Sequence, residues 1–178
     1  MIAASETAAA ALDRLTTVIP DFPSPGIVFR DLTPVFADAA ALRLVIDELI
    51  APFAGTFDVV AGVEARGFVL AAAAAVIADT GVVMIRKAGK LPRETVSREY
   101  ALEYGTAILE LHTDELPPGT RVLLVDDVLA TGGTLEASLG LLGDAGLVAA
   151  GVSVVLELEA LNGRPRIGNV PFHTLQLV

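Results

Sequence analysis

The clearest pattern along the chain is a series of short apolar runs that alternate with segments of helical periodicity. The apolar runs occupy residues 57–62, 81–85, 122–125, 148–158 and 172–178. Runs of this length, bounded by turn residues and rich in valine and leucine, are typical of strands buried on both faces of a sheet. Their alternation with helices predicts an α/β fold with a mostly parallel central sheet flanked by helices.

Four segments predict helices. Two alanine-rich stretches are expected to be helical, at residues 3–18 and at about 68–78. A third helix is expected from about Asp38 to Phe53, because its apolar residues recur at helical spacing. A fourth is expected behind Thr134, a favoured N-cap residue, because leucines follow it at the same spacing.

Three further segments read as loops, and one more as a strand. Residues 20–31 contain three prolines within six positions, which predicts a stiff, extended path. Residues 86–95 combine glycine, proline and charge and predict a mobile loop, and residues 162–168 predict a polar loop. Residues 106–111 alternate in part, which predicts a strand paired with the loop before it.

Length and composition narrow the class of protein. A chain of 178 residues predicts one domain with a substantial core. The longest apolar run, residues 68–78, is too short to span a bilayer, so no membrane partner is expected. No basic segment precedes an apolar one at the N-terminus, so we expect no secretory signal and a cytoplasmic location. The absence of cysteine excludes disulfides and thiolate zinc sites.

Charge is unevenly distributed along the chain. The formal net charge of −10 argues against a nucleic-acid partner, because such proteins usually present a basic face. Five of the twelve basic residues nevertheless fall within thirteen positions, and these are Arg86, Lys87, Lys90, Arg93 and Arg98. A basic loop on an acidic protein indicates a small polyanion as ligand.

The strand expected at 122–125 leads directly into polar residues that could bind a ligand. Asp126 and Asp127 follow it, and then comes a turn of small residues, 130–134, before the fourth helix. The amides of that turn and the positive end of the helix dipole suit a bound phosphate monoester. Glycines in the turn let the backbone come close to the phosphate, and threonine hydroxyls can donate to it.

The two aspartates need a partner other than the phosphate, because like charges repel. Vicinal hydroxyls or a magnesium ion are the natural choices, so the implied ligand is a sugar phosphate with a free diol, most simply ribose 5-phosphate. The turn has neither the Gly-Lys-Ser/Thr of a P-loop nor a G-x-G-x-x-G. The alternative is an ordinary strand-turn-helix whose aspartates act as caps, although caps do not need two adjacent carboxylates.

The segment from Asp126 to Thr134 resembles the phosphoribosyl-pyrophosphate motif of the type I phosphoribosyltransferases. The resemblance implies their fold, with a small base-binding hood contributed mainly by about residues 20–35. It also implies that Asp126 and Asp127 hold the ribose and Mg²⁺, the metal indirectly. The implied 5′-phosphate site consists of Ala130, Thr131, Gly132, Gly133 and Thr134.

The proline-rich segment resembles the base-binding hood of the adenine phosphoribosyltransferases. That resemblance implies that Phe29 stacks on adenine, that the Val28 carbonyl accepts from the exocyclic amine and that the Arg30 amide donates to the ring nitrogen. The alternative is a Phe29 that merely packs beneath a surface loop. Val128 is expected to face Phe29 across the base, where relatives often place leucine, so a modest rise in adenine KM of up to ~0.8 kcal/mol is expected.

A second loop, residues 63–67, resembles the diphosphate loop of the same family. The diphosphate contacts implied by the resemblance are Glu64, Ala65, Arg66, Gly67, Arg86, Lys87 and Lys90. Arg66 would be the charged contact, with Glu64 acting through magnesium-bound water, and the basic loop would reach across a dimer interface. The alternatives are a solvated Glu-x-Arg salt bridge and a solvated basic loop. Arg93 and Arg98 depart from the smaller or acidic residues expected in relatives.

The Glu103-Tyr104-Gly105 segment also resembles the adenine phosphoribosyltransferases. That resemblance assigns Glu103, with Arg66, to catalysis. In the family this glutamate is proposed to handle the purine N7 proton; the alternative is an exposed strand carboxylate. His112 and His173 have no spaced partner and are expected at the surface or in packing. The implied reaction forms AMP and diphosphate from adenine and phosphoribosyl pyrophosphate, in a homodimer. Orotate, xanthine or hypoxanthine-guanine enzymes, and a regulator that senses the sugar donor, are the rival interpretations.

Overall fold

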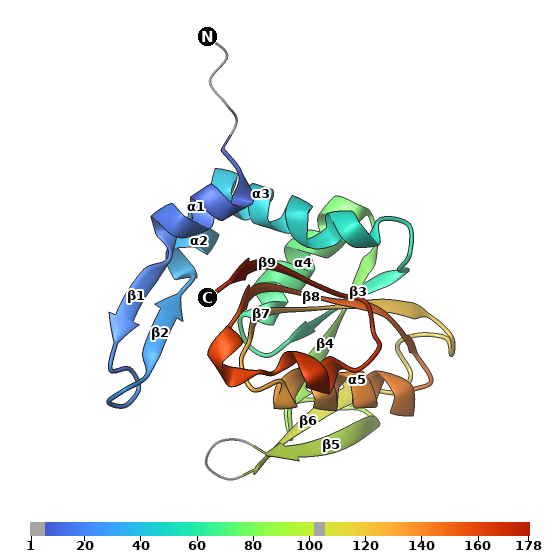
Figure 1. Ribbon diagram of the computed structural model, residues 1–178. Helices are drawn as coiled ribbons and strands as arrows, with labels where there is room; N and C mark the ends of the chain where they lie inside the picture. Colours follow the sequence, from blue (N-terminus) through green and yellow to red (C-terminus); the bar gives the residue numbers. More distant parts are fainter. Residues whose placement is uncertain (1–5, 102–105) are drawn as a thin grey trace.

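The computed structural model describes residues 6–101 and 106–178, which form a seven-stranded sheet, a two-stranded hairpin and surrounding helices (Figure 1). The sheet has the order β5-β6-β4-β3-β7-β8-β9. Its strands are β3 (Val59–Val63), β4 (Gly81–Lys87), β5 (Thr95–Ala101), β6 (Thr106–His112), β7 (Arg121–Leu129), β8 (Val148–Glu157) and β9 (Phe172–Leu177). Neighbours from β4 to β9 are parallel, whereas β6 runs antiparallel to β4 and β5. The prediction of a mostly parallel α/β sheet is confirmed.

Helices cover both faces of the sheet and explain why its central strands are apolar throughout. All five residues of β3 are buried. On one face the core joins the sheet to α1 (Ala8–Leu15), α3 (Ala39–Ile50) and α4 (Gly67–Ala78). On the other face it joins the sheet to α5 (Gly133–Asp144). No described helix could cross a membrane, because the longest have twelve residues.

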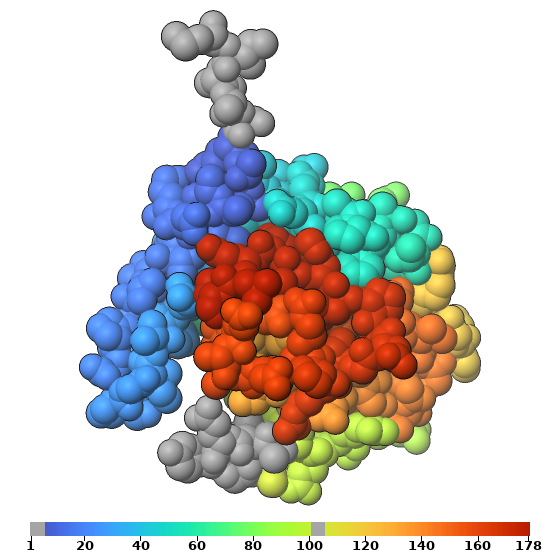
Figure 2. Space-filling view, viewed as in Figure 1, coloured from blue at the N-terminus to red at the C-terminus, as the bar shows by residue number. Residues whose placement is uncertain are grey.

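The N-terminal region differs from its prediction. Within the described residues α1 ends at Leu15, and the chain then enters β1 (Thr17–Pro20), so the expected helix through residue 18 was wrong. β1 pairs antiparallel with β2 (Val28–Asp31), and the segment 20–31 therefore forms the end of β1, the tip and the second strand of a hairpin rather than an isolated loop. This hairpin projects from the body of the molecule (Figures 1 and 2). After it, α2 (Thr33–Ala37) adds a short helix that was not predicted.

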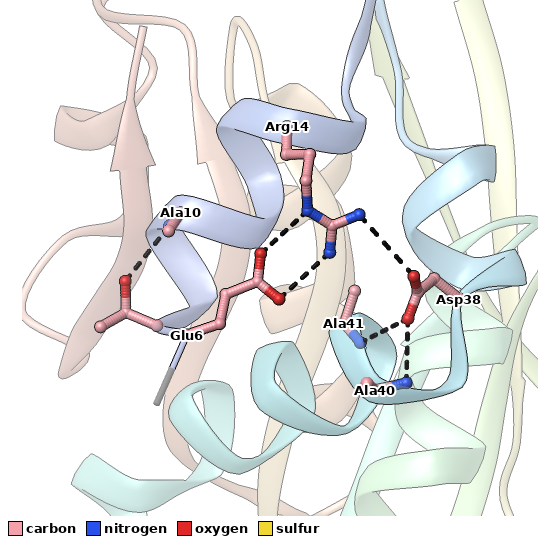
Figure 3. Close-up of polar contacts among 7 residues, drawn as sticks. Glu6, Ala10, Arg14, Asp38, Ala40 and Ala41 are labelled. Carbon is pink, nitrogen blue, oxygen red and sulfur yellow. Dashed lines mark hydrogen bonds and ion pairs between the residues drawn. The ribbon is translucent and has the colours of Figure 1, made fainter. Parts of the chain in front are cut away.

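An ion pair joins α1, which leads into the hairpin, to the start of α3. Arg14 on α1 pairs with Glu6 at 2.9 Å and reaches Asp38 at 3.8 Å (Figure 3). Asp38 in turn caps α3 by accepting from the Ala40 and Ala41 amides, which confirms the predicted start of that helix. The helix ends at Ile50 rather than Phe53, because Pro52 follows in a short 3₁₀ turn, Ala51–Phe53.

The expected loop at 86–95 is shorter than predicted. β4 continues through Lys87 and β5 begins at Thr95, a strand that its charged residues concealed. Arg93 pairs at 2.6 Å with both Asp114 and Glu115. Arg98 on β5 pairs with Asp144 at the end of α5, also at 2.6 Å, so both unexpected arginines fasten this edge of the sheet to its neighbours.

Candidate functional site

Asp126 and Asp127 lie inside β7 rather than after it. β7 runs to Leu129 because its pairing with β8 continues past the aspartates to Val128 and Leu129. Both carboxylates are buried, with 9% and 6% of their residue surface exposed. The prediction that they follow the strand was therefore wrong by a few residues, yet they still lie near its carboxyl end, where ligands of parallel sheets bind.

Burial raises the pKa of both carboxyl groups. The pKa of Asp126 lies well above its usual range, first because of burial and then because of the charge on Asp127. The pKa of Asp127 is also raised by burial, but Arg66 opposes the shift. Arg66 Nε lies 2.6 Å from Asp127 Oδ2 without the alignment of a hydrogen bond, and this buried oxygen has no hydrogen-bond partner among the described residues. Such an oxygen suits a ligand hydroxyl or a cation.

The small-residue turn closes around an anion-sized space. Gly132 has a positive φ of +86° and is the N-cap of α5, which begins at Gly133. The predicted N-cap, Thr134, lies instead in the first helical turn. The first amides of a helix have no partner within it, so those of Gly133 and Thr134 are available to a ligand. A cavity of about 70 Å³ lies there, lined by Asp126, Val128, Leu129, Ala130, Thr131, Gly132, Thr134 and Leu135.

The Glu64–Gly67 loop meets this site from the neighbouring strand. It joins β3 to α4, and its Glu64–Ala65 peptide bond is cis. A Cβ placed on Gly67 would lie 2.9 Å from Asp126 Oδ1, so the start of α4 packs directly on that carboxylate. Arg66 projects from the same loop onto Asp127. The two predicted loops therefore share one edge of the sheet.

Glu64 gathers the basic residues that the sequence assigned to the diphosphate. Its Oε1 lies 2.6 Å from Lys90 Nζ, and its Oε2 accepts from the Lys87 amide at 3.0 Å. Arg86 Nε lies 3.5 Å from the same carboxylate. The pKa of Glu64 is lowered, chiefly by the hydrogen bond from Lys90. In this arrangement Glu64 holds Arg86, Lys87 and Lys90 beside the loop that carries Arg66.

A larger cavity, of about 280 Å³, opens between the hairpin and the carboxyl edge of the sheet (Figure 2). Its lining consists of Ile27, Val28, Phe29, Arg30, Arg66, Asp127, Val128, Ala130 and Leu158. The Phe29 ring meets Phe22 edge to face, with ring centroids 5.2 Å apart. Arg66 Cζ lies 5.3 Å from the Phe29 ring centroid, so one guanidinium contacts both the hairpin and Asp127.

The pairing of the hairpin fixes which backbone groups face the cavity. Opposed residues of an antiparallel pair alternate between those that exchange hydrogen bonds and those that do not. Pro20 has no N–H, so its pair with Val28 cannot exchange, and the Ile19–Phe29 pair takes that role. The Val28 carbonyl and the Arg30 amide consequently face away from β1, on the edge of β2 that borders the cavity.

The structure thus brings together most residues that the sequence singled out. Val28, Phe29, Arg30 and Val128 line one cavity with Arg66 and Asp127. The predicted catalytic Glu103, with Tyr104, lies outside the described residues. Sequence reasoning missed Ile27 and Leu158; Leu158 directly follows β8, so its place at a strand carboxyl end was a usable signal. His112 is buried, as expected of a packing residue.

The described residues contain no group of three or more His, Cys, Asp or Glu side chains placed to hold a metal ion. Asp126 and Asp127 offer two adjacent, buried carboxylates at the ligand edge. Mg²⁺ commonly binds through one or two carboxylates while ligand oxygens and waters complete its shell. The pair therefore fits a metal that arrives with an oxygen-rich ligand.

Known proteins resemble this chain in sequence and in structure. The family model described as "Phosphoribosyl transferase domain" matches residues 35–169. An adenine phosphoribosyltransferase of Renibacterium salmoninarum is 61% identical over 164 residues, covering 92% of this chain and 90% of its own. The crystal structure of the adenine phosphoribosyltransferase from Rhodothermus marinus has a TM-score of 0.90 and 44% identity, covering 96% and 98% of the two chains.

A second similar structure carries ligands. The Saccharomyces cerevisiae adenine phosphoribosyltransferase, complexed with an imino-altritol bisphosphate and adenine, has a TM-score of 0.90 at 34% identity and covers 95% of this chain and 98% of its own. The matched region of the family model contains both aspartates, the small-residue turn and the Arg66 loop. The chain belongs to the phosphoribosyltransferase family and, within it, to the adenine phosphoribosyltransferases.

Proposed function

We propose that this chain transfers 5-phosphoribose from phosphoribosyl pyrophosphate to adenine, giving AMP and diphosphate in purine salvage. The observation that carries the proposal is the cavity that joins the Phe29 ring and the edge of β2 to Asp127. The anion-sized cavity of the small-residue turn lies beside it and shares Val128 and Ala130 with it. A base, a ribose and a 5′-phosphate would lie there in the order in which they occur in AMP.

Adenine is the base that the edge of β2 favours. A backbone carbonyl at Val28 and an amide at Arg30 present an acceptor and a donor side by side. Adenine offers the complement, an exocyclic amine that donates and a neighbouring ring nitrogen that accepts. Hypoxanthine and guanine have a carbonyl oxygen where adenine has the amine, and a site built to hydrogen-bond one pattern strongly rejects the other. Phe29 and Val128 would hold the two faces of the ring.

The ribose and the phosphate would be held from β7 and α5. Asp126 and Asp127 would accept from the ribose hydroxyls, and Ala130 to Thr134 would hold the 5′-phosphate through backbone amides and hydroxyls. Asp126 and Asp127 are also the residues that would help to hold Mg²⁺, indirectly. When bound, the metal would neutralise charge on the donor's diphosphate.

Arg66 would change partners when the ligands bind. In this structure its guanidinium contacts both the Phe29 ring and Asp127, where the base and the ribose are proposed to lie. Binding of both ligands would turn Arg66 toward the diphosphate, beside Arg86, Lys87 and Lys90. Positive side chains there would stabilise the leaving group while positive charge develops at the anomeric carbon. Glu64, Ala65 and Gly67 would shape this loop, and Glu103 stays the predicted acid/base residue.

The decisive experiment is AMP formation from adenine, phosphoribosyl pyrophosphate and Mg²⁺, run beside hypoxanthine, guanine, xanthine and orotate. Turnover confined to adenine would support the proposal. Turnover of another base would contradict the assignment of Val28 and Arg30 while retaining the sugar-phosphate site. Binding of phosphoribosyl pyrophosphate without any turnover would indicate a regulator instead. The expected cytoplasmic location stays a prediction.

We also propose that a second copy of the chain covers the outer surface of α4 and β4. Val82 and Met84 point to the α4 side of the sheet, because the alternating Val83 and Ile85 lie in the core on the α5 side. Val76 on α4 is 81% exposed. This apolar face adjoins the basic residues at the end of β4, and its exposed members are Val69, Val76, Val82, Met84 and Ile108. Apolar faces of this kind mark protein interfaces.

Sedimentation of the purified chain tests this homodimer. We expect a dimer for the wild type and a shift toward monomer for Val76→Glu. Val148→Glu is the matched control, because Val148 is also half-exposed but lies at the start of β8, away from α4. A monomeric wild type would contradict the proposal, as would a Val76→Glu variant that dimerises like the control.

A further inference from the structure

The turn after β8 lies directly against the proposed 5′-phosphate loop. It contains two short 3₁₀ segments, Glu159–Leu161 and Arg164–Ile167, with the buried Gly163 between them. A Cβ placed on Gly163 would collide with the Ala130 carbonyl oxygen and would lie 2.9 Å from the Gly132 amide nitrogen. Conversely, a Cβ on Gly132 would lie 2.6 Å from the Gly163 carbonyl oxygen. The two segments therefore touch backbone to backbone, with no space for a side chain.

The turn is anchored independently of the phosphate loop. Arg164 forms a two-pronged ion pair with the buried carboxylate of Glu157, at the end of β8, with Nε 2.9 Å from Oε1. Its Cζ also lies 4.5 Å from the Phe172 ring centroid. Ile167, at the other end of the turn, is buried in the core on the α5 side. These contacts of Arg164 and Ile167 hold the turn beside the loop.

We propose that Gly163 is a positioning residue for the sugar-phosphate donor. Its backbone sets the position of residues 130–132 and thereby the direction of the Gly133 and Thr134 amides, which follow at the start of α5, toward the 5′-phosphate. Hydrogen bonds weaken steeply when their angle departs from linearity, so a small displacement of this loop loses affinity. The inference rests on the proposed function, since it assigns the role of a residue that supports the proposed phosphate site without touching the ligand.

The test is Gly163→Ala, which adds one methyl group at the contact. We expect KM for phosphoribosyl pyrophosphate to rise about tenfold while KM for adenine changes less than about twofold, because misplacement of order 1 Å strongly reduces activity. Gly143→Ala is the matched control, because a Cβ on Gly143 of α5 meets nothing within 4 Å. Both kinetic constants of Gly143→Ala should equal those of the wild type.

A second variant tests the same proposal if Gly163→Ala fails to fold. Arg164→Ala removes the anchor of the same turn without adding atoms to the contact, and we expect the same selective rise in KM for the donor. The positioning role is overturned if neither variant shows a selective rise in KM for phosphoribosyl pyrophosphate, or if KM for the donor and KM for adenine rise together.

Calorimetric binding of ribose 5-phosphate separates this inference from the proposed reaction. We expect Gly163→Ala to bind ribose 5-phosphate about tenfold more weakly than the wild type and Gly143→Ala to bind it equally well. This measurement needs no turnover, so it decides the role of Gly163 even if the wild type does not act on adenine. Equal binding by the wild type and by folded Gly163→Ala would overturn the proposal.

Discussion

The sugar-phosphate region and the base region of the site are built in different ways. β7 carries the aspartates and is paired on both sides, with β3 and with β8. The β1–β2 hairpin forms a sheet of its own that projects from the body of the molecule (Figure 1). Its Phe22 and Val28 are 50% and 54% exposed, whereas Asp126 and Asp127 are buried.

This difference separates what each region can contribute. The buried region holds its polar groups in fixed positions before any ligand binds, so a change there should strongly affect use of the donor. The hairpin supplies one wall of an open cavity, so a change there should affect adenine more weakly. Substitutions in the two regions should accordingly differ in the size of their effect on activity and in which KM they alter.

The largest effect is expected for Asp127→Asn. Loss of a charged acceptor for a ribose hydroxyl should lower kcat/KM for phosphoribosyl pyrophosphate on the order of 100-fold, from ~3 kcal/mol for a hydrogen bond to a charged group. Steady-state kinetics with the donor varied would measure it. A threefold change or less in a folded variant would show that the buried aspartate does not bind the sugar.

The next effect is expected for Phe29→Leu, in the hairpin. Loss of aromatic stacking, worth about 1–3 kcal/mol per base, should raise adenine KM about tenfold while KM for the donor stays within about twofold. Phe22→Leu is the control, because Phe22 contacts Phe29 edge to face but does not line the cavity. Equal effects of the two variants would contradict stacking by Phe29.

A smaller effect is expected for Val128→Leu, where the two regions meet. Val128 lines the base cavity from β7, opposite the hairpin. One added methylene should lower adenine KM by up to about fourfold, or ~0.8 kcal/mol. An unchanged adenine KM, determined at saturating donor, would show that Val128 does not pack on the base.

The smallest effect on catalysis is expected for Asp58→Asn, which lies outside both regions. Hydrogen bonds from Arg121 lower the pKa of Asp58 to about 2. Because the folded pKa is below the unfolded value of ~3.9, the pair stabilises the fold above about pH 4, and this contribution is lost as the pH falls toward 2. The difference in Tm between wild type and Asp58→Asn should therefore shrink over that range, with both KM values unchanged at pH 7.

Thermal unfolding at several pH values, with kinetics at neutral pH, would check the role of Asp58. A Tm difference that is constant from pH 5 to pH 2 would contradict the assigned pKa shift. A change in either KM would mean that the amino-terminal edge of the sheet, where Asp58 meets Arg121, communicates with the ligand edge.

The sequence predicts those parts of the fold and site whose residues are consecutive. The apolar strand, the two aspartates and the small-residue turn form one local segment, so their relation could be inferred without a structure. β5 could not be predicted, because charged residues such as Arg98 interrupt its pattern and find partners on α5.

Local sequence patterns did not predict contacts between distant segments either; only the family resemblance placed Val128 opposite Phe29. Glu64 pairs with Lys90, 26 positions away, and Gly163 touches a loop that precedes it by about thirty residues. The Val28 carbonyl faces the cavity because Val28 pairs with Pro20, which has no N–H to exchange. That pairing is set by the fold of the hairpin. Local pattern carries no information on such partners.

The strand order also constrains how the chain can acquire its structure during synthesis. β3 lies between β4 and β7, so half of its pairing must wait until Arg121–Leu129 has been made. By then α4, which is apolar on every side, has already emerged with part of the sheet beneath it missing. The β3–β7 pairing at the centre of the sheet therefore cannot form before β7 has been synthesised, and apolar surface left uncovered until then favours association with other chains.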